Sequence, residues 1–438
     1  MPHTDPLRNT TSSSEKKTTH HTTLCSFLDV LSTPVEETSW FVPGRLEVFG
    51  KHTDYGGGRS LLGAVDRGIS FYARTNDSDL IRLRSTAFPN DELTWKLSQD
   101  ITAGAASWAT HAASAITRLN RNFPGQLRGT DIRVDSTLPL ASGMSSSSAM
   151  VVGIARCLID ISGIGALPDF RANITSFESF AGYMSCMENG LTFGTLRGHG
   201  GVGTFGGSED HTAMLCCRAD ALSQYSFAPV VHHETVTTDP SMQFVIAVSG
   251  VLAEKTGAAL QAYNRLSLTV SQLLTQWNTH TGRSDTTLMQ ALNSTEKALA
   301  TLQKIAGEEG YPRQRLEQFV KESEHIVPAA CQAFATHDYT ALGHLASSSQ
   351  HLSLEYLGNQ IPHTHALTLM ARAAGAVASS AFGAGFGGAV WALVPRSDAN
   401  DFTLHWQRAY LQKYPELTKR ASFFPVHLSG RATRTATP

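Results

Sequence analysis

Four consecutive serines about a third of the way along this 438-residue chain could hold an anionic group. Ser145–Ser148 follow a short turn, Pro139–Met144, which comes after a strand-like segment and precedes an apolar helical pattern. Free backbone N–H groups at the start of a helix, together with its macrodipole, attract anions. One serine would suffice as a helix cap, so four predict a phosphate-binding loop whose hydroxyls also suit Mg²⁺. The predicted phosphate-binding residues are Pro139, Ser142, Gly143, Met144, Ser145, Ser146, Ser147 and Ser148.

Three other glycine-rich segments have the outline of nucleotide motifs but not their context. Gly44–Lys51 resembles a Walker A loop, yet five residues separate its glycines and His52 follows in place of Ser or Thr. Gly198–Gly203 and Gly383–Gly388 both satisfy GxGxxG. A dinucleotide site needs a strand before this motif and a helix after it. Neither segment has that predicted order, so the sequence does not favour a dinucleotide-binding fold.

The elements that must position these groups fall into two lobes. Residues 1–22 are polar and are predicted to be a disordered tail. Strand-like and helical patterns then occur in separate runs, which is typical of an α+β fold. The polar stretch 232–241 predicts the boundary between an N-terminal domain, residues 23–235, and a C-terminal domain, residues 236–438. The apolar run Ala213–Cys217 is interpreted as a buried strand.

Composition and charge exclude several classes of protein. Lys and Arg number 35 against 37 Asp and Glu, a net charge of −2 that argues against a general nucleic-acid binder. No run of 18 apolar residues occurs, so no membrane span is predicted. Six scattered cysteines and a polar N-terminus without an apolar signal segment predict a cytoplasmic protein with reduced thiols.

Three segments, in order along the chain, resemble the motifs of the GHMP small-molecule kinases. The serine segment PLASGMSSSSAM is similar to the family's PxxxGLSSSA, and residues 382–394, FGAGFGGAVWALV, resemble its C-terminal GAGFGGCxxALV. Residues 43–58, PGRLEVFGKHTDYGGG, resemble the signature GRVNLIGEHTDYNGG of the galactokinase-like branch. The resemblance implies an N-terminal lobe like domain 2 of ribosomal protein S5 and a ferredoxin-like C-terminal lobe. It also implies ATP and Mg²⁺ as cofactors, and a structural glycine loop of Gly383, Gly385, Gly387 and Gly388.

The resemblance also implies catalytic roles in phosphorylation of the anomeric hydroxyl of a monosaccharide. Asp210 matches the family's catalytic base, with the adjacent Glu209 as the competing candidate, and Arg45 matches the signature arginine. The fixed charge of Arg45 is expected to keep Asp210 ionised by lowering its pKa and to stabilise the transferring phosphoryl group. Glu188 and Ser147 match the magnesium ligands. Glu188 lies 22 positions before Asp210, farther than in the family, because a glycine-rich segment intervenes.

The sugar-binding residues implied by the resemblance include one departure from the family. His52, Asp54, Gly207 and Tyr263 match positions that contact sugar hydroxyls. Lys51 stands where the signature has glutamate. It either selects a negatively charged substrate such as a uronic acid, or it points to solvent or pairs with a nearby acid and leaves galactose specificity intact. A non-catalytic regulator that binds sugar and ATP on the same fold is a third alternative.

Overall fold

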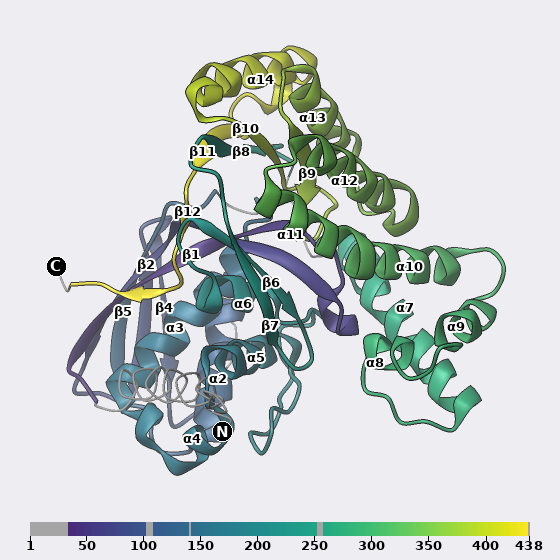
Figure 1. Ribbon diagram of the computed structural model, residues 1–438. Helices are drawn as coiled ribbons and strands as arrows, with labels where there is room; N and C mark the ends of the chain where they lie inside the picture. Colours follow the sequence, from purple (N-terminus) through teal and green to yellow (C-terminus); the bar gives the residue numbers. More distant parts are fainter. Residues whose placement is uncertain (1–33, 102–107, 140–141, 252–256, 437–438) are drawn as a thin grey trace, which may run out of the picture.

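The computed structural model describes residues 34–101, 108–139, 142–251 and 257–436, which form two lobes and a helical unit beside them (Figure 1). The predicted tail, residues 1–22, lies outside the described residues, as do Leu140 and Ala141 of the serine segment. Strands and helices are segregated as expected for an α+β fold. Among the described residues, no helix combines the length and apolar character needed to cross a membrane.

The N-terminal lobe is built on a sheet of nine strands in the described chain. Strand β2 is its centre, because β1 pairs along most of its length while β6 and β5 pair with its first and last parts on the other side. The order along the main path is β13-β1-β2-β5-β3-β4, with β12 and β6 on β2 and β7 on β6. The strands are β1 Glu37–Phe49, β2 Arg59–Thr75, β3 Leu80–Ser85, β4 Phe88–Lys96, β5 Thr130–Ser136, β6 Ala221–Ser226, β7 Val231–Thr237, β12 Leu428–Ser429 and β13 Thr433–Arg434.

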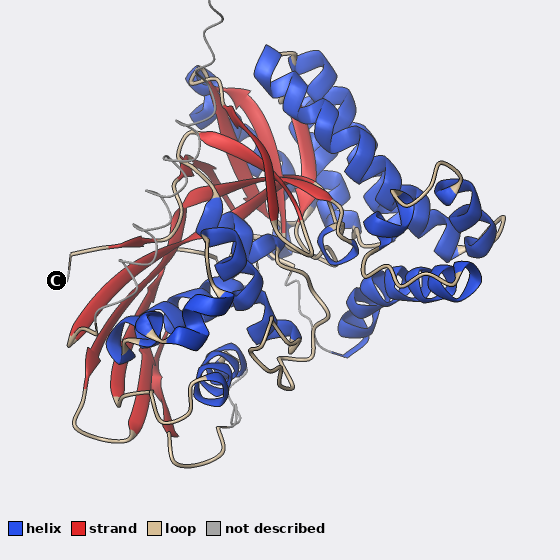
Figure 2. Cartoon of the chain, turned by 60° about the horizontal axis from the view of Figure 1, so that its bottom comes forward, coloured by secondary structure: helices blue, strands red, loops and turns tan. Residues whose placement is uncertain are grey.

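One face of this sheet is covered by helices (Figure 2). Helix α3 lies at the centre of the layer, against β1, β2, α2, α5 and α6. Its apolar side chains, among them Val151, Ile154 and Leu158, are fully buried in the core. The helices are α2 Ala109–Asn122, α3 Ser146–Ser162, α4 Pro168–Asn173, α5 Phe177–Asn189 and α6 Glu209–Cys216.

The C-terminal lobe contains a four-stranded antiparallel sheet in the order β11-β8-β10-β9. In chain order this is 4-1-3-2, with helices between the first and second strands and between the third and fourth, which is the ferredoxin-like arrangement. Helices α13 and α14 pack on the sheet around Trp406 and Tyr410. The strands are β8 Met242–Val248, β9 Ala378–Phe382, β10 Ala389–Pro395 and β11 Ser422–Val426; the helices nearest them are α12 Tyr339–His351, α13 Pro362–Ala373 and α14 Ala399–Lys413.

A helical unit between β8 and α12 extends to the right of both sheets in Figure 1. It has its own core around Trp277, Leu316 and Phe319. One of its turns, η3 at Lys321–Ile326, widens from α-helix to π-helix, as does η4 at Leu352–Leu357, which continues α12; this distortion is frequent at functional sites. Its helices are α7 Gly257–Thr281, α8 Leu288–Leu292, α9 Ala298–Ala306, α10 Tyr311–Val320 and α11 Val327–Thr336.

Two expectations need correction. The end of the chain, assigned to the C-terminal domain, returns to the N-terminal sheet, where β12 pairs with β2 and β13 with β1. Ala213–Cys217 is not a strand, because residues 213–216 are the second half of helix α6. A short run of apolar residues fits a buried strand as well as a buried helix. When every side of the element is buried, no alternation of polar and apolar residues remains to distinguish the two.

Candidate active site

The candidate site lies where helix α6 begins, between two loops of the N-terminal lobe. We call Gly50–Gly58, which joins β1 to β2, the sugar loop, and Ser142–Ser148, which leads into α3, the serine loop. A third segment, the glycine turn Gly383–Gly388 between β9 and β10, reaches the same place from the C-terminal lobe. His52 of the sugar loop contacts the Ala384 carbonyl at 3.1 Å. A side chain at Gly383 would lie 2.8 Å from the Gly143 carbonyl, so the turn packs closely on the serine loop.

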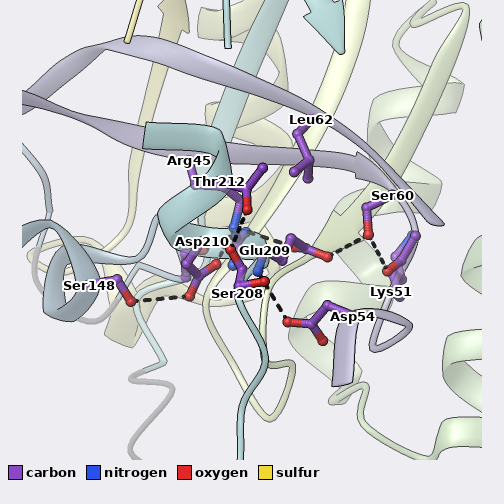
Figure 3. Close-up of polar contacts among 12 residues, drawn as sticks. Arg45, Lys51, Asp54, Ser60, Leu62, Ser148, Ser208, Glu209, Asp210 and Thr212 are labelled. Atoms are coloured by element: carbon purple, nitrogen blue, oxygen red, sulfur yellow. Dashed lines mark hydrogen bonds and ion pairs between the residues drawn. The ribbon is translucent and has the colours of Figure 1, made fainter. Parts of the chain in front are cut away.

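Arg45 and Asp210 form an ion pair at the centre of the site (Figure 3). The Arg45 Nε donates to the Asp210 carboxylate at 2.7 Å, and its Nη1 donates to the Gly143 carbonyl at 3.1 Å. The arginine side chain is 5% exposed, whereas that of Asp210 is 26% exposed. Burial works against the charge of Arg45, but the carboxylates of Asp210, Glu47 and Glu209 outweigh it and raise the pKa of Arg45. The carboxylate that faces outward is therefore held by a permanently charged partner.

Glu209, the competing candidate for the base, points the other way. Its carboxyl group accepts a hydrogen bond from Ser60 at 2.7 Å and lies 3.7 Å from the Arg45 Nε. Burial, followed by the neighbouring charge of Glu47, raises the pKa of Glu209 well above its usual value. Burial likewise raises the pKa of Glu47, which is hydrogen-bonded to Glu209. These two acids form an interior pair, whereas Asp210 is the one turned toward the loops.

The serine loop has the geometry of an anion site. Gly143 and Ser145 have left-handed backbones, φ 78° and 60°, and the chain then enters the 17-residue helix α3 directly. Within the described residues, the side chain of Ser145 makes no capping hydrogen bond, and Ser145, Ser146 and Ser147 are partly exposed. Ser148 is buried and donates to Asp210 at 3.4 Å. The helix N-terminus and three accessible hydroxyls fit a phosphate group.

The remaining predicted phosphate-binding residues support this loop from behind. The Met144 side chain is fully buried, and its carbonyl accepts a hydrogen bond from the Arg45 amide at 3.2 Å. The Ser142 hydroxyl is buried and has no hydrogen-bond partner among the described residues. Pro139 lies at the end of the segment that follows β5. Of the eight predicted residues, three are thus buried and five are partly exposed, namely Pro139, Gly143, Ser145, Ser146 and Ser147.

The predicted sugar-binding residues, Lys51 apart, gather beside Asp210. The Glu209 amide donates to Asp54 at 3.3 Å, and a side chain at Gly207 would come within 2.4 Å of the same carboxylate oxygen. Burial, then the charge of Asp210, raises the pKa of Asp54. The rings of His52 and Tyr263 meet edge to face at 5.8 Å. Burial and the charge of Asp54 raise the pKa of Tyr263. A hydroxyl-binding group therefore adjoins the Arg45–Asp210 pair.

Lys51 is separate from this group. Its side chain is buried, 1% exposed, and its ammonium donates to Ser349 of α12 at 2.7 Å. In Figure 3 it lies beyond Ser60, on the side of Glu209 that is farther from Asp210 and Ser148. This burial is at odds with the expectation that Lys51 meets a charge on the substrate. A partner inside the protein, the second alternative, agrees with the contacts.

The magnesium assignment has partial support. Glu188, at the end of α5, is 13% exposed and lies 3.1 Å from the buried His211, the residue after Asp210. In the part of the chain that the structure describes, no group of three His, Cys, Asp or Glu side chains could hold a metal ion. Mg²⁺ normally takes only one or two protein ligands and completes its shell with phosphate and water. A carboxylate and a hydroxyl, Glu188 and Ser147, are donors of the right chemistry.

Several residues that hold the site were not foreseen. Arg315 and Gln318 of α10 are buried and bind the backbone carbonyls of His52 and Lys51. Glu322 of η3 accepts hydrogen bonds from the amides of Gly50 and Lys51 at 2.9 and 3.4 Å. No local pattern in residues 313–322 indicates this role, because the partners are more than 260 positions away. The one indication in the sequence was Lys51 itself, because a lysine in place of the signature glutamate needs a negatively charged partner.

Comparison with known families agrees with this arrangement. The family model "GHMP kinases N terminal domain" matches residues 110–178, and "GHMP kinases C terminal" matches residues 329–412. "Galactokinase galactose-binding signature" matches residues 27–75, which contain Arg45 and the sugar loop. The chain belongs to the GHMP kinase superfamily. Within it, the signature assigns the chain to the galactokinase-like branch and supports a sugar kinase.

Individual relatives extend the similarity over most of this GHMP kinase. A galactokinase of Chloroflexus aggregans is 27% identical over 365 residues, 82% of this chain and 84% of that protein. One from Glaesserella parasuis is 26% identical over 180 residues, 41% of this chain and 44% of that protein. The structure of Lactococcus lactis galactokinase complexed with galactose superposes with a TM-score of 0.74 at 20% identity and covers 95% of this chain and 99% of that one. At that identity, the superposition establishes the two-lobed fold.

Proposed function

We propose that the protein transfers the γ-phosphoryl group of ATP to the anomeric hydroxyl of a monosaccharide, with galactose as the first candidate. The observation that carries this proposal is the Arg45–Asp210 pair, which lies between a loop suited to phosphate and a group suited to sugar hydroxyls. Asp210 contacts the serine loop through Ser148, and its neighbour Glu209 contacts the sugar loop through Asp54. A base in this position lies between the two substrates.

In the proposed reaction, Asp210 accepts the proton of the anomeric hydroxyl. The sugar oxygen forms a bond to the γ-phosphorus, the bond from that phosphorus to the bridging oxygen breaks, and ADP leaves. A positioned base contributes typically ~10²- to 10⁴-fold in rate. Arg45 donates to Asp210 and also to the Gly143 carbonyl of the serine loop. Its positive charge would therefore stabilise the negative charge of the phosphoryl group during transfer.

The N-terminus of α3 and the hydroxyls of Ser145, Ser146 and Ser147 are proposed to bind the phosphates of ATP. Glu188 and Ser147 would hold Mg²⁺, which, when bound, spreads the charge of the phosphate oxygens during transfer. The Glu188 carboxylate lies 3.1 Å from the buried His211 ring, a neighbour that would help to orient it toward the ion. Asp54 has the two acceptor oxygens needed for neighbouring sugar hydroxyls, and His52, Tyr263 and Gly207 surround it.

The structure does not favour a uronic acid as the substrate. The proposed selection by Lys51 requires its ammonium at the sugar, but Lys51 is buried and bonded to Ser349. A neutral sugar is therefore the better candidate. A purely regulatory protein would have no use for an ion-paired acid between the two loops, and this pair favours an enzyme.

The experiment is ADP release by the purified protein with Mg²⁺ and ATP against galactose, glucose, arabinose, galacturonate and glucuronate. We expect sugar-dependent ADP release with a neutral hexose and little with either uronate. Formation of sugar 1-phosphate, seen by ³¹P NMR, would identify the anomeric oxygen as the acceptor. Sugar and ATP binding by calorimetry without any ADP release would instead establish the regulatory alternative and reject the kinase.

A further inference from the structure

Lys51 takes part in a buried chain of hydrogen bonds that crosses from the sugar loop to the C-terminal half of the molecule. Its ammonium donates to the Ser349 hydroxyl at 2.7 Å, and that hydroxyl donates to the Glu322 carboxylate at 2.7 Å. The donor and acceptor roles are consistent along the whole chain, because lysine can only donate and an ionised carboxylate can only accept. All three side chains are at most 1% exposed.

The same carboxylate oxygen of Glu322 also holds the backbone of the sugar loop. It accepts from the amides of Gly50, at 2.9 Å, and Lys51, at 3.4 Å. Gly50 has φ 106°, and a side chain there would collide with Ser60 at 2.3 Å, so the turn is tightly packed and requires glycine. The loop therefore depends on one interior oxygen at the point where it leaves β1.

The opposite edge of the loop is held from the same helices. Gln318 donates to the Lys51 carbonyl at 2.9 Å. Arg315 donates to the His52 carbonyl and to the Tyr55 hydroxyl, the latter at 3.0 Å. His52 has a left-handed backbone, φ 57°, which a non-glycine residue keeps only when its surroundings hold it. The orientation of the His52 ring next to Tyr263 follows from these contacts.

The electrostatics explain why lysine is suited to this position. A buried carboxylate such as Glu322 is costly unless a positive charge compensates it. Lys51 also lies within electrostatic reach of Glu47, which is influenced by Glu322 as well. A glutamate at position 51, as in the signature, would add a further acid to an interior that already holds Glu47, Glu209 and Glu322. The charge of Lys51 therefore suits Glu322 and Glu47, both on the protein side of the loop.

We propose that Lys51, Ser349 and Glu322 form a buried relay that positions the sugar loop, so that the C-terminal half of the molecule sets the affinity for the monosaccharide. This proposal rests on the proposed sugar kinase function and deepens it. Lys51 is a positioning residue that does not touch the substrate, and the relay acts through the backbone of Gly50–His52.

The test compares three variants with matched controls, in the full-length protein. Glu322→Gln keeps the accepting oxygen and the size of the side chain but removes the charge, Lys51→Met removes the opposite charge, and the third variant combines both. For each single variant we expect the KM for the sugar to rise about tenfold, with the KM for ATP and kcat within about twofold. In the double variant, the KM for the sugar should rise by less than the product of the two single increases, because neither charge is then left without its partner.

The controls lie on the same elements. Glu324→Gln changes an acid of η3 that is 30% exposed, and Ser347→Ala removes a hydroxyl of α12 that bonds within its own helix. Both should leave the KM for the sugar unchanged. A general loss of stability would move the KM for ATP and the melting temperature together with the KM for the sugar, and that pattern would overturn a specific positioning role.

A second measurement does not depend on turnover. Amide hydrogen exchange of a peptide covering Gly50 and Lys51 should become at least tenfold faster in Glu322→Gln than in the wild-type protein, and remain unchanged in Glu324→Gln. Unchanged exchange would overturn the relay. A selective loss of uronate turnover in Lys51→Met would also overturn the relay, since Lys51 would then bind the substrate directly. If the wild-type protein phosphorylates no sugar, the proposed function fails, while the exchange measurement still decides the relay.

Discussion

The two loops that meet at Asp210 are held in different ways. The serine loop takes its shape largely from its own left-handed Gly143 and Ser145, which lead directly into α3, and its backbone accepts long-range hydrogen bonds from Arg45 on the adjoining β1. The sugar loop is held by the side chains of Arg315, Gln318 and Glu322, which lie 263 to 272 positions further along the chain. The proposed phosphate-binding loop thus takes its backbone shape mostly from one segment, whereas the proposed sugar-binding loop depends on contacts from the other half of the molecule.

Because the two loops are held by different residues, the affinity for the sugar and the affinity for ATP should respond to different substitutions. A change in the helical unit should alter sugar binding and leave nucleotide binding nearly intact, while a change in the serine loop should do the reverse. Asp210 contacts the serine loop directly and the sugar loop through its neighbour, so its loss should affect the reaction itself. The following predictions test that division, beginning with the largest effect.

Asp210→Asn is expected to lower kcat by ~10²- to 10⁴-fold, because the amide cannot accept the proton of the sugar hydroxyl. ATP binding, measured by calorimetry, should stay within about threefold of wild type, since asparagine keeps the size of the side chain and Asp210 meets the serine loop through the Ser148 hydroxyl. Glu209→Gln is the control and should retain kcat within about tenfold. A reversed result would move the base to Glu209.

Arg315→Met should destabilise the fold by roughly 2–4 kcal/mol, because buried acceptors such as the His52 carbonyl lose their donor. The KM for the sugar should rise while the KM for ATP changes little. Arg313→Met, on the same helix, removes only a partly exposed pair with Glu317 and should cost under about 0.5 kcal/mol. Urea denaturation and steady-state kinetics measure both effects. Equal losses for sugar and ATP would contradict the division between the loops.

Two glycine substitutions should separate the affinities. Gly207→Ala places a methyl group 2.4 Å from the Asp54 carboxylate and should raise the KM for the sugar at least about tenfold, with ATP unaffected. At Gly143 there is space for the methyl group of an alanine. Gly143→Ala forces that alanine into a left-handed backbone, at a cost of roughly 1–2 kcal/mol, and should weaken the binding of ATP rather than that of the sugar.

Two further glycines serve as controls for these substitutions. Gly200→Ala has open space around it and should be neutral. Gly125→Ala carries the same kind of backbone strain, φ 73°, away from the site and should lower stability without changing either KM. If Gly125→Ala altered ATP binding as much as Gly143→Ala, the local role of the serine loop would be refuted.

The smallest effect concerns pH. The pKa of Glu209 is raised by burial, so above its ordinary value of 4.5 the folded protein keeps a proton that the unfolded chain releases. This contribution to stability is complete below that value and is lost as pH rises through the raised pKa. Glu209→Gln removes the dependence, so the variant should gain about 1 kcal/mol relative to wild type between about pH 5 and about pH 8. Denaturation curves at both values measure it, and parallel losses in the two proteins would exclude the effect.

The sequence could predict which segments form the candidate site because their motifs are local. The serine loop, the sugar loop and the glycine turn are each a short run whose residues demand a particular backbone, and the α+β division followed from the separate runs of strands and helices. The fold of residues 213–216 could not be predicted, because an apolar run of that length fits a buried strand as well as a helix. The return of β12 and β13 to the first sheet also had no local signal, since pairing partners are chosen across space.

The sequence alone determined which groups are available: a phosphate loop, an acid at the start of α6, an arginine on β1, and a lysine where an acid was expected. Only the tertiary structure decided what each of them contacts. It turned Asp210 toward the loops and Glu209 toward the interior, although they are neighbours, because successive residues of a helix face different directions. It also gave Lys51 an interior partner, Ser349, which lies 298 positions away. The sequence shows the charge of a side chain. Which group neutralises that charge depends on packing, because only folding brings the two groups together.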